Sequence, residues 1–376
     1  MGLRVITFSL IVITFKLLVI TVDKNSSIGY NIDVKGGASM KYTTDKKQTI
    51  ILYILEKIGA GTQGVSKVVA ETLGISTNTV YIYLNELIEK GIIEKEKRGS
   101  YKLIDSRYEY TFKRSEGDLI SDTRPYEECL EKRIEHLSDN IKHIWSYSLS
   151  EMVNNVIDHS NAENMKVIIV QNYLTTSVLL VDDGVGIFEK IKNHFGLSNL
   201  DEAICELFKG KLTTDEANHS GEGIFFTSKM MDRFFISSSG KIFTTSKFDD
   251  DAILDMNANV QGTCVLMLLS NFTHKTPKEI FDQYSDIEGG FVTTKIPLKN
   301  IFDAAPVSRS QAKRVCNRLE KFEEAILDFD GIEWIGQGFA HQIFVVFKNA
   351  HPNISIVPIN MSDSVESMYN HVVKTK

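Results

Sequence analysis

The feature that most constrains this chain is a segment of helical periodicity whose two faces differ in chemistry. Residues 148–160, SLSEMVNNVIDHS, carry one apolar stripe at helical spacing. A second face carries Glu151, Asn155 and His159 at i, i+4 and i+8, with Asp158 beside them. Acidic, amide and imidazole groups along one face of a half-buried helix indicate a binding site. A purely structural role for the same face is the alternative that this segment alone leaves open.

Two predicted strands follow this helix, and the second ends in a carboxylate beside glycines. The strands are expected at 166–173 and 176–182, and the chain continues as Asp182-Asp183-Gly184-Val185-Gly186. A buried carboxylate is costly unless a donor satisfies it. The amino group of adenine is such a donor, and Gly184 and Gly186 would let the backbone approach the base.

A second glycine-rich turn comes later and is expected to open a helix. Residues 219–223, HSGEG, precede a helix predicted at 224–234, and glycines at a helix N-terminus offer free N–H groups to phosphates. Gly262 and Thr263 then lead into an apolar strand expected at 264–269. The three glycine-containing motifs therefore fit the two ends of a nucleotide.

In this order, the motifs ExxxN, DxGxG and GxG resemble the GHKL ATPases over roughly residues 125–295. This family includes gyrase B subunits, mismatch-repair ATPases, heat-shock chaperones, histidine kinases and anti-sigma-factor serine kinases. The resemblance implies a Bergerat-type α/β sandwich that binds ATP with Mg²⁺. It makes Asn155 the Mg²⁺ ligand, Asp182 the partner of adenine N6, and Glu151 the catalytic base that would orient a water or a substrate hydroxyl.

The resemblance also implies supporting roles. Thr263 would support Asp182 through water, Gly221 and Gly223 would cradle the phosphates, and residues from about 188 to 220 would form a lid over ATP. Lys209, Lys211 or His219 could reach the phosphates from that lid. The expected nucleotide contacts are Asn155, Asp158, Asp182, Gly184, Gly186, Ile187, Ser220, Gly221, Glu222, Gly223 and Thr263.

The family branch decides what chemistry follows from ATP binding. A histidine kinase needs a phosphoacceptor histidine on a long helical hairpin, and the segment that holds His136 and His143 is too short for one. EMVNNVIDH resembles the anti-sigma-factor serine kinases more closely. Hydrolysis, phosphotransfer and binding alone all stay open.

The segment before the nucleotide motifs resembles bacterial winged-helix regulators. Helices are expected at 47–58, 65–73 and 77–90, and short strands at 92–93 and 101–103. This order is the winged helix-turn-helix plan, which presents the third helix to the major groove of DNA. The GxGxxG run at 59–64 follows a predicted helix rather than a strand, so it is a connection and not a dinucleotide site.

The predicted DNA-binding residues are Thr77, Asn78, Tyr81, Lys95, Lys97 and Arg98. Over residues 40–105 the chain has ten basic side chains and eight acidic ones. Phosphate contacts dominate affinity for DNA, so this small excess predicts modest, salt-sensitive binding. Winged helices also mediate protein contacts, which is the alternative.

The C-terminal part alternates helices and strands, which predicts a small α/β domain. The run at 325–344, AILDFDGIEWIGQGFAHQIF, resembles STAS-like domains of the kind fused to GHKL modules. STAS partners of anti-sigma-factor kinases carry a phosphorylatable Ser or Thr where this chain has Gly336-Gln337-Gly338. Docking of a protein partner without phosphorylation is therefore the expectation.

The first 39 residues differ from the rest because residues 5–22 are apolar apart from Thr, Ser and Lys16. Lys16 would lie near the middle of a membrane span, where a charge costs about 2.5–3.5 kcal/mol. Lys35-Gly36-Gly37 can be encoded as a ribosome-binding sequence at a suitable distance before Met40. We expect translation to start at Met40, with a membrane anchor as the less favoured alternative.

The predicted fold is α+β in three domains. They are a winged helix at 40–106, a Bergerat-type ATP-binding domain at 107–298 and a STAS-like domain at 299–376, after an extension at 1–39. Four dispersed cysteines fit reduced thiols in a cytoplasmic protein. The net charge of −7 argues against a protein whose whole surface coats nucleic acid, and leaves room for one local basic face. The expected function is an ATP-binding regulator of DNA and protein partners that could form a homodimer. A protein serine/threonine kinase and an ATP-hydrolysing dimeric clamp are the alternatives.

Overall fold

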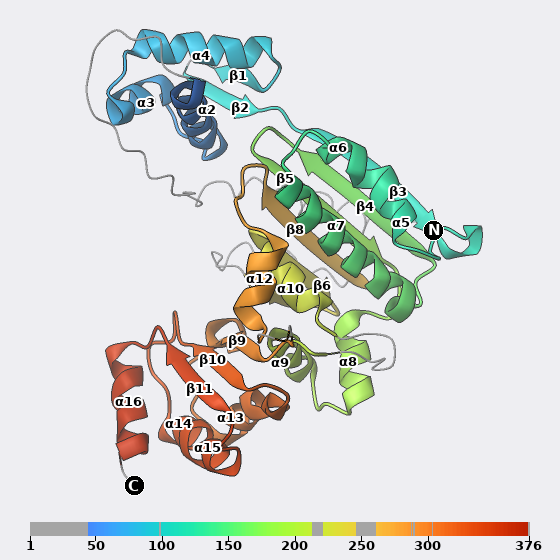
Figure 1. Ribbon diagram of the computed structural model, residues 1–376, viewed down its shortest axis with the longest axis vertical. Coiled ribbons are helices and arrows are strands. Elements are labelled where there is room, and N and C mark those ends of the chain that lie inside the picture. Colours follow the sequence, from blue (N-terminus) through green and yellow to red (C-terminus); the bar gives the residue numbers. More distant parts are fainter. Residues whose placement is uncertain are drawn as a thin grey trace.

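The structure is a computed structural model that describes residues 44–374, apart from residues 98, 213–220, 246–260, 287, 289 and 303. It contains three sheets, two built from antiparallel strands and one from parallel strands. The N-terminal and C-terminal units lie at opposite ends of a central unit (Figure 1). None of the helices in these described ranges has the length and apolar character that a membrane span requires.

The N-terminal unit contains three helices and a hairpin with their own hydrophobic core. The Ser76 hydroxyl accepts a hydrogen bond from the Thr79 amide at 3.1 Å, which caps the third helix. Leu174, from the central unit, packs against this core. The elements are α2 (Thr44–Gly59), α3 (Val65–Leu73), α4 (Thr77–Glu89), β1 (Ile93–Lys97) and β2 (Ser100–Leu103).

The central unit is built on a six-stranded antiparallel sheet in the order β3-β4-β5-β8-β6-β7. Strands β5 and β8 are neighbours, although about 80 residues separate them in sequence, and that intervening chain supplies part of the walls of the site. The strands are β3 (Ser106–Lys113), β4 (Asn164–Gln171), β5 (Thr175–Asp182), β6 (Arg233–Ser238), β7 (Lys241–Thr244) and β8 (Thr263–Ser270).

Helices α7, α10 and α12 cover one face of this sheet (Figure 1). Trp145 and Leu149 of α7 are fully buried against the alternating apolar residues of β4, β5 and β8. Helix α7 continues directly into a π-helical segment, η3 (Asn155–Ser160). The helices are α5 (Thr123–Tyr126), α6 (Lys132–Ile134), α7 (Asp139–Asn154), α8 (Ile187–Phe195), α9 (Leu200–Lys209), α10 (Gly223–Met230) and α12 (Pro277–Tyr284).

The C-terminal unit has a three-stranded parallel sheet in the order β11-β10-β9. The boundary expected at residue 299 lies after β9, although β9 belongs to this sheet. The elements are β9 (Thr293–Pro297), α13 (Arg309–Cys316), β10 (Glu324–Asp328), α14 (Gln337–His341), α15 (Lys348–Ala350), β11 (Ser355–Ile359) and α16 (Asp363–Lys374). A π-helical segment, η6 (Gln342–Phe347), joins α14 to α15. Two further short helices of this unit are η4 (Leu298–Asn300) and η5 (Leu319–Lys321), whereas η1 (Arg114–Glu116) and η2 (Glu127–Glu131) belong to the central unit.

The observed elements of the central unit differ from the predicted ones, and two differences concern strand pairing. The helix expected at 224–234 ends at Met230, because Phe234 and Ile236 belong to β6 and pair with β8. The edge strand β3 was not predicted, although Tyr108, Tyr110 and Phe112 alternate within it. Strand β6 pairs with β8 and strand β3 pairs with β4, and neither partner is close enough in sequence for a local pattern to indicate the pairing.

Candidate functional site

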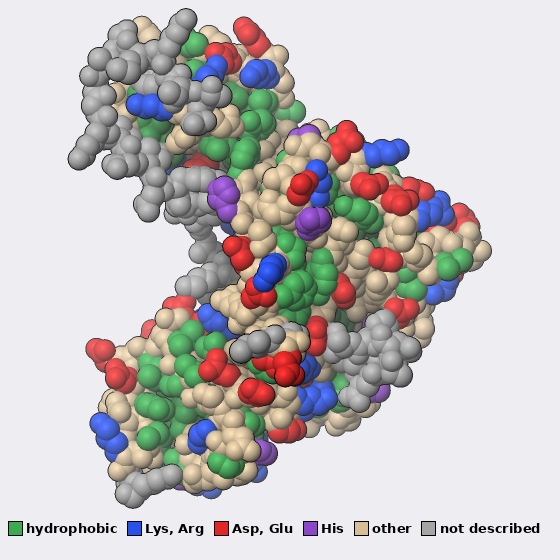
Figure 2. All heavy atoms as spheres, in the orientation of Figure 1, with side chains coloured by type: hydrophobic (Ala, Val, Ile, Leu, Met, Phe, Trp, Pro, Cys, Tyr) green, Lys and Arg blue, Asp and Glu red, His purple; other side chains and the backbone are tan. Residues whose placement is uncertain are grey.

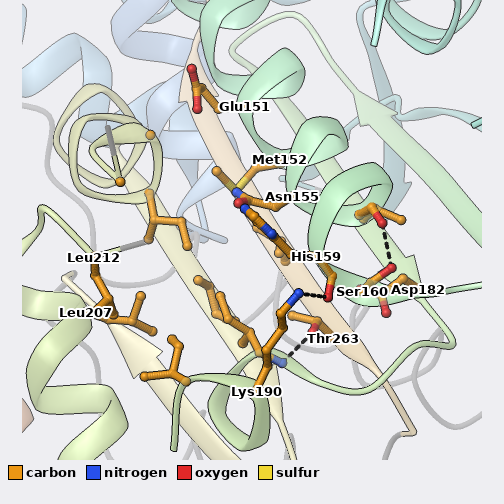
Figure 3. Close-up of a pocket in the computed structure, with 18 of the residues that line it drawn as sticks. Glu151, Met152, Asn155, His159, Ser160, Asp182, Lys190, Leu207, Leu212 and Thr263 are labelled. Atoms are coloured by element: carbon orange, nitrogen blue, oxygen red, sulfur yellow. Dashed lines mark hydrogen bonds between the residues drawn. The ribbon is translucent and has the colours of Figure 1, made fainter. Parts of the chain in front are cut away.

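A cavity of about 290 Å³ opens where α7, η3, β5, β8 and α8–α10 meet. Figure 3 shows Glu151, Asn155 and His159 along one side of the α7–η3 helix, with Asp182 and Thr263 near its far end. The predicted site residues that line this cavity are Glu151, Asn155, Asp182, Gly186, Ile187, Gly221, Gly223 and Thr263. The chain therefore brings together residues that are as far apart in sequence as 151 and 263.

Asp182 lies at the end of β5, and its side chain is nearly completely buried. Its Oδ1 accepts a hydrogen bond from the Gly184 amide at 2.8 Å. Burial raises the pKa of this carboxyl to about 6, against the lowering effect of hydrogen bonds from Gly184 and Thr263. At neutral pH the cavity therefore holds a buried, ionised acceptor.

Thr263, the first residue of β8, bonds the start of α8 at this end of the cavity. Its hydroxyl accepts a hydrogen bond from the Ile187 amide at 3.0 Å. Hydrogen bonding from Thr263 also lowers the pKa of Asp182, against the effect of burial. The preceding Gly262 has a φ of +89°, and a Cβ there would lie 2.1 Å from the Asp182 carbonyl oxygen. Only glycine fits between the two strand ends.

The two glycines after Asp182 allow close packing within the site. A Cβ on Gly184 would lie 2.2 Å from the Ser160 carbonyl oxygen, and one on Gly186 would lie 2.6 Å from Ser238 Oγ. The Ser160 carbonyl also accepts a hydrogen bond from the Val185 amide at 2.8 Å. Gly184 therefore joins the end of η3 to the Asp182 turn, whereas Gly186 lines the cavity itself.

Glu151 lies at the opposite end of the cavity, beside the N-terminus of α10. A Cβ on Gly223, the first residue of that helix, would lie 1.9 Å from Glu151 Oε2. The first N–H groups of a helix attract anions. A carboxylate and a predicted anion-binding helix end thus lie in contact, about two helical turns from the Asp182 end of the cavity.

The π-helical segment η3 turns the side chains of Asn155 and His159 toward the cavity. The wide turns of this segment leave backbone carbonyl oxygens that accept hydrogen bonds from side chains outside it. Arg114, the first residue of η1 directly after β3, donates to the carbonyls of Val156 at 3.2 Å and Ile157 at 3.0 Å, which anchors the segment. π-helical segments often occur at functional sites.

Several predicted site residues do not line the cavity. Asp158 is exposed, and Gly184 and Glu222 lie outside the wall. Ser220 and His219 lie outside the described residues.

The two lysines proposed for the lid point elsewhere. The Lys209 ammonium is buried against Glu206 and donates to the carbonyl of Arg314 at 3.1 Å. The Lys211 ammonium donates to the carbonyl of Lys321 at 3.0 Å. Both lysines therefore bond the C-terminal unit.

Most of the apolar wall of the cavity and one cationic side chain were not predicted. Lys190 of α8 lines the cavity and donates to the His159 carbonyl at 2.7 Å. Leu180 and Val265 also line it, two positions from Asp182 and Thr263, so the period-two pattern of the strands could have identified them. His159 lines the cavity from the polar face that the sequence indicated. The remaining unassigned lining residues are Met152, Val156, Ser160, Ile191, Leu207, Gly210, Leu212, Ile224, Phe225 and Ile236.

A metal at this site would need ligands beyond the protein. No three His, Cys, Asp or Glu side chains in the described part of the chain cluster as metal ligands. Asn155 offers one amide oxygen, and Mg²⁺ is commonly held by one or two protein groups together with phosphate oxygens and water. The residues present therefore fit a metal that arrives with a phosphorylated ligand.

The predicted DNA-facing residues are exposed on the N-terminal unit. Thr77, Asn78 and Tyr81 lie on the first two turns of α4, and Lys95 and Lys97 lie on β1. Arg98 lies outside the described residues. None of the described members of this set lines the central cavity.

The chain was compared with known proteins. Residues 311–366 match the model of a STAS-like domain of unknown function (DUF4325). The prediction of a STAS-like C-terminal domain is thus confirmed for these residues. No curated protein matches the chain.

Proposed function

We propose that this protein is an ATP-binding regulator. A Bergerat-type domain of the GHKL kind would bind ATP and Mg²⁺, a winged helix would bind duplex DNA, and the STAS-like unit would bind a protein partner. The observation that carries the proposal is the buried Asp182 carboxylate, because it shares one cavity with Asn155 and Glu151 and with the N-terminus of α10.

Adenine would lie at the Asp182 end of the cavity. The carboxylate would accept a hydrogen bond from the exocyclic amino group, and Ile187, Ile236 and Val265 would pack on the faces of the ring. An ionised acceptor in an apolar cavity is costly when it lacks a donor, so a ligand that supplies one gains affinity. This geometry favours a purine with an amino group at the buried edge.

The phosphates would lie at the other end, where Gly221 and Gly223 precede and open α10. Asn155 would hold Mg²⁺ between this helix end and η3, with phosphate oxygens completing the metal shell.

A second candidate function, phosphoryl transfer or ATP hydrolysis, is favoured by one observation. The Glu151 carboxylate touches Gly223 at the predicted phosphate site, where a base could orient a hydroxyl or a water for attack. A protein serine/threonine kinase would form a stable phosphoprotein, and a dimeric clamp would release phosphate slowly.

The proposal is tested by calorimetric titration of the full chain with ATP and Mg²⁺. Asp182→Asn replaces one acceptor oxygen by a donor that opposes the adenine amino group. A hydrogen bond to a charged group contributes about 1.5–3 kcal/mol, so ATP should bind roughly tenfold to a hundredfold more weakly.

The matched control is Asp139→Asn, which neutralises an exposed carboxylate at the start of α7. It should bind ATP with the affinity of the wild type. Equal affinities for the wild type and Asp182→Asn would refute the adenine assignment, and no binding by the folded wild type would refute the whole proposal.

A further inference from the structure

One wall of the cavity is also the contact surface for the C-terminal unit. Leu207, Gly210 and Leu212 line the cavity from the end of α9 and the segment after it. In the same stretch, Glu206 and Lys209 point away from the cavity and form an ion pair of 2.7 Å that is almost completely buried. A buried ion pair contributes little to stability by itself, and its geometry is specific.

The C-terminal unit completes this buried pair. Asn317 donates to Glu206 Oε1 at 3.0 Å, and its own carbonyl accepts a hydrogen bond from the Lys209 ammonium. Arg318 Nε lies 3.6 Å from Glu206 Oε2. Breaking such a network leaves an uncompensated buried charge, so the contact has one strongly preferred arrangement.

Backbone hydrogen bonds continue from this network to the predicted phosphate site. Arg318 donates from Nη2 to the Lys211 carbonyl at 2.9 Å. The next residue, Leu212, donates its amide to the Gly221 carbonyl at 3.0 Å. A Cβ on Gly221 would lie 2.5 Å from the Leu212 backbone, so the two segments are in close contact. Gly221 lies two residues before α10 begins.

The Asp182 end of the cavity has a different support. Gly184, Gly262 and Thr263 hold that carboxylate through bonds and contacts within the central sheet. The two ends of the cavity thus rest on different parts of the molecule.

We infer that Arg318, together with the Glu206–Lys209 pair, positions the glycine turn at 221–223 for phosphate binding. The inference rests on the proposed function, since it concerns the same cavity. The STAS-like unit would then be part of the nucleotide site, although none of its residues lines the cavity. A partner that withdraws this unit would weaken phosphate binding, and phosphate binding would strengthen the contact, because linkage is reciprocal.

The test is Arg318→Gln in the full chain, which removes the bond to Lys211 and the charge beside Glu206. Arg318 has a φ of +59°, and Gln tolerates this backbone no better than Arg, so the change acts through the side chain. ATP and ADP should bind about twofold to thirtyfold more weakly, as expected for a residue that couples two sites without touching the ligand. Adenosine, measured by ligand-observed NMR, should bind as it does to the wild type.

A second measurement needs no ligand. Hydrogen exchange of the empty protein should become faster in peptides that cover Leu212 and residues 221–226, and stay unchanged in peptides that cover residues 178–187. Lys241→Gln is the matched control, because it removes an exposed ion pair with Asp201 at the other end of α9. It should change neither exchange nor ATP affinity.

The outcomes separate the two hypotheses. Unchanged exchange and unchanged ATP affinity in Arg318→Gln would overturn the positioning role and leave the nucleotide site intact. Equal losses for ATP and adenosine would also overturn it, since they would indicate general loosening. Faster exchange at residues 221–226 in a protein whose wild type binds no nucleotide would support the positioning contact and refute the proposed ligand.

Discussion

Asp182 and Asp183 are adjacent carboxylates with opposite environments. Burial raises the pKa of Asp182 to about 6. Partial burial opposes ionisation of Asp183 as well, yet hydrogen bonds from Asn164 and from the Glu163 amide hold its pKa below the usual range. Ionised Asp182 therefore destabilises the empty protein, whereas ionised Asp183 stabilises it.

This contrast predicts opposite changes in the free energy of unfolding at neutral pH. Asp182→Asn should stabilise the empty protein by about 1–3 kcal/mol, because it removes a buried charge and keeps an acceptor for the Gly184 amide. Asp183→Asn should destabilise it by about 1–2 kcal/mol. The Asp183 carboxylate accepts three hydrogen bonds, from the Glu163 amide and from the Asn164 amide and side chain, and the side-chain amide of Asn cannot accept all three. Urea denaturation of both variants measures the two effects.

The pH dependence follows from the direction of each shift. Because the folded-state pKa of Asp182 is raised, the wild-type free energy of unfolding falls as pH rises from about 4 to 6. The extra stability of Asp182→Asn over the wild type should grow over this window. The lowered pKa of Asp183 gives stability that is present above pH 4 and lost in acid. A destabilised Asp182→Asn protein at pH 7 would contradict the burial of an ionised group.

Among the elements, the turn before β8 depends on a single glycine. Gly262→Ala places a Cβ 2.1 Å from the Asp182 carbonyl oxygen at a φ of +89°. The backbone strain costs about 1–2 kcal/mol, and the steric overlap adds about 1–3 kcal/mol. Thermal or urea unfolding should therefore show a loss of about 2–5 kcal/mol.

Gly196→Ala separates backbone strain from steric overlap. Gly196 ends α8 with a φ of +61°, and a Cβ there would meet nothing within 4 Å. Gly196→Ala should therefore lower the free energy of unfolding by only about 1–2 kcal/mol, the cost of backbone strain alone. Similar losses in both variants would show that Gly262 does not pack tightly against Asp182.

The sequence predicted the elements whose signals are local. Ser76 and Gly74 mark the ends of α4 and α3 at the expected residues, because capping depends on neighbouring backbone groups. The predicted helix 224–234 ran into the first two residues of β6, because Phe234 becomes part of a strand only through pairing with β8.

The candidate site shows the same distinction between local and distant signals. Asp182, Gly186 and Gly223 were predicted from short motifs, and all three line the cavity. The contacts of Lys209 with Arg314 and Asn317 join residues more than 100 positions apart, and no local pattern reports such a contact. The cavity wall formed by Leu207 and Leu212 was not predicted either, because the cavity residues that it faces are distant in sequence.

At the scale of the whole molecule, charge limits any contact with DNA. Figure 2 shows Lys and Arg side chains interspersed with Asp and Glu over the visible face. In the N-terminal unit, Lys102 pairs with Glu94 at 2.7 Å, which further reduces the basic character of the hairpin. Few phosphate contacts are therefore available to the proposed winged helix.

Binding to a labelled DNA duplex should consequently be weak and salt-sensitive, with a slope set by a small number of phosphate contacts. In a fluorescence anisotropy titration over about 50–200 mM salt, replacing Lys95 and Lys97 by Gln should reduce the slope of log affinity against log salt by about 2. Lys278→Gln, on the exposed side of α12, is the control and should leave the slope unchanged. No retention of duplex at about 50 mM salt would favour a protein partner for this unit.

The position of β9 bears on how the C-terminal unit can be separated from the rest. The family match begins at residue 311, whereas β9 (Thr293–Pro297) pairs with β10 along its whole length. The Thr294 hydroxyl also donates to the Lys209 carbonyl at 2.7 Å. A fragment cut at the family boundary would leave an unpaired edge on β10 and invite self-association. The smallest fragment that keeps this sheet intact is therefore longer than the family match, and it must include β9 from residue 293 onward.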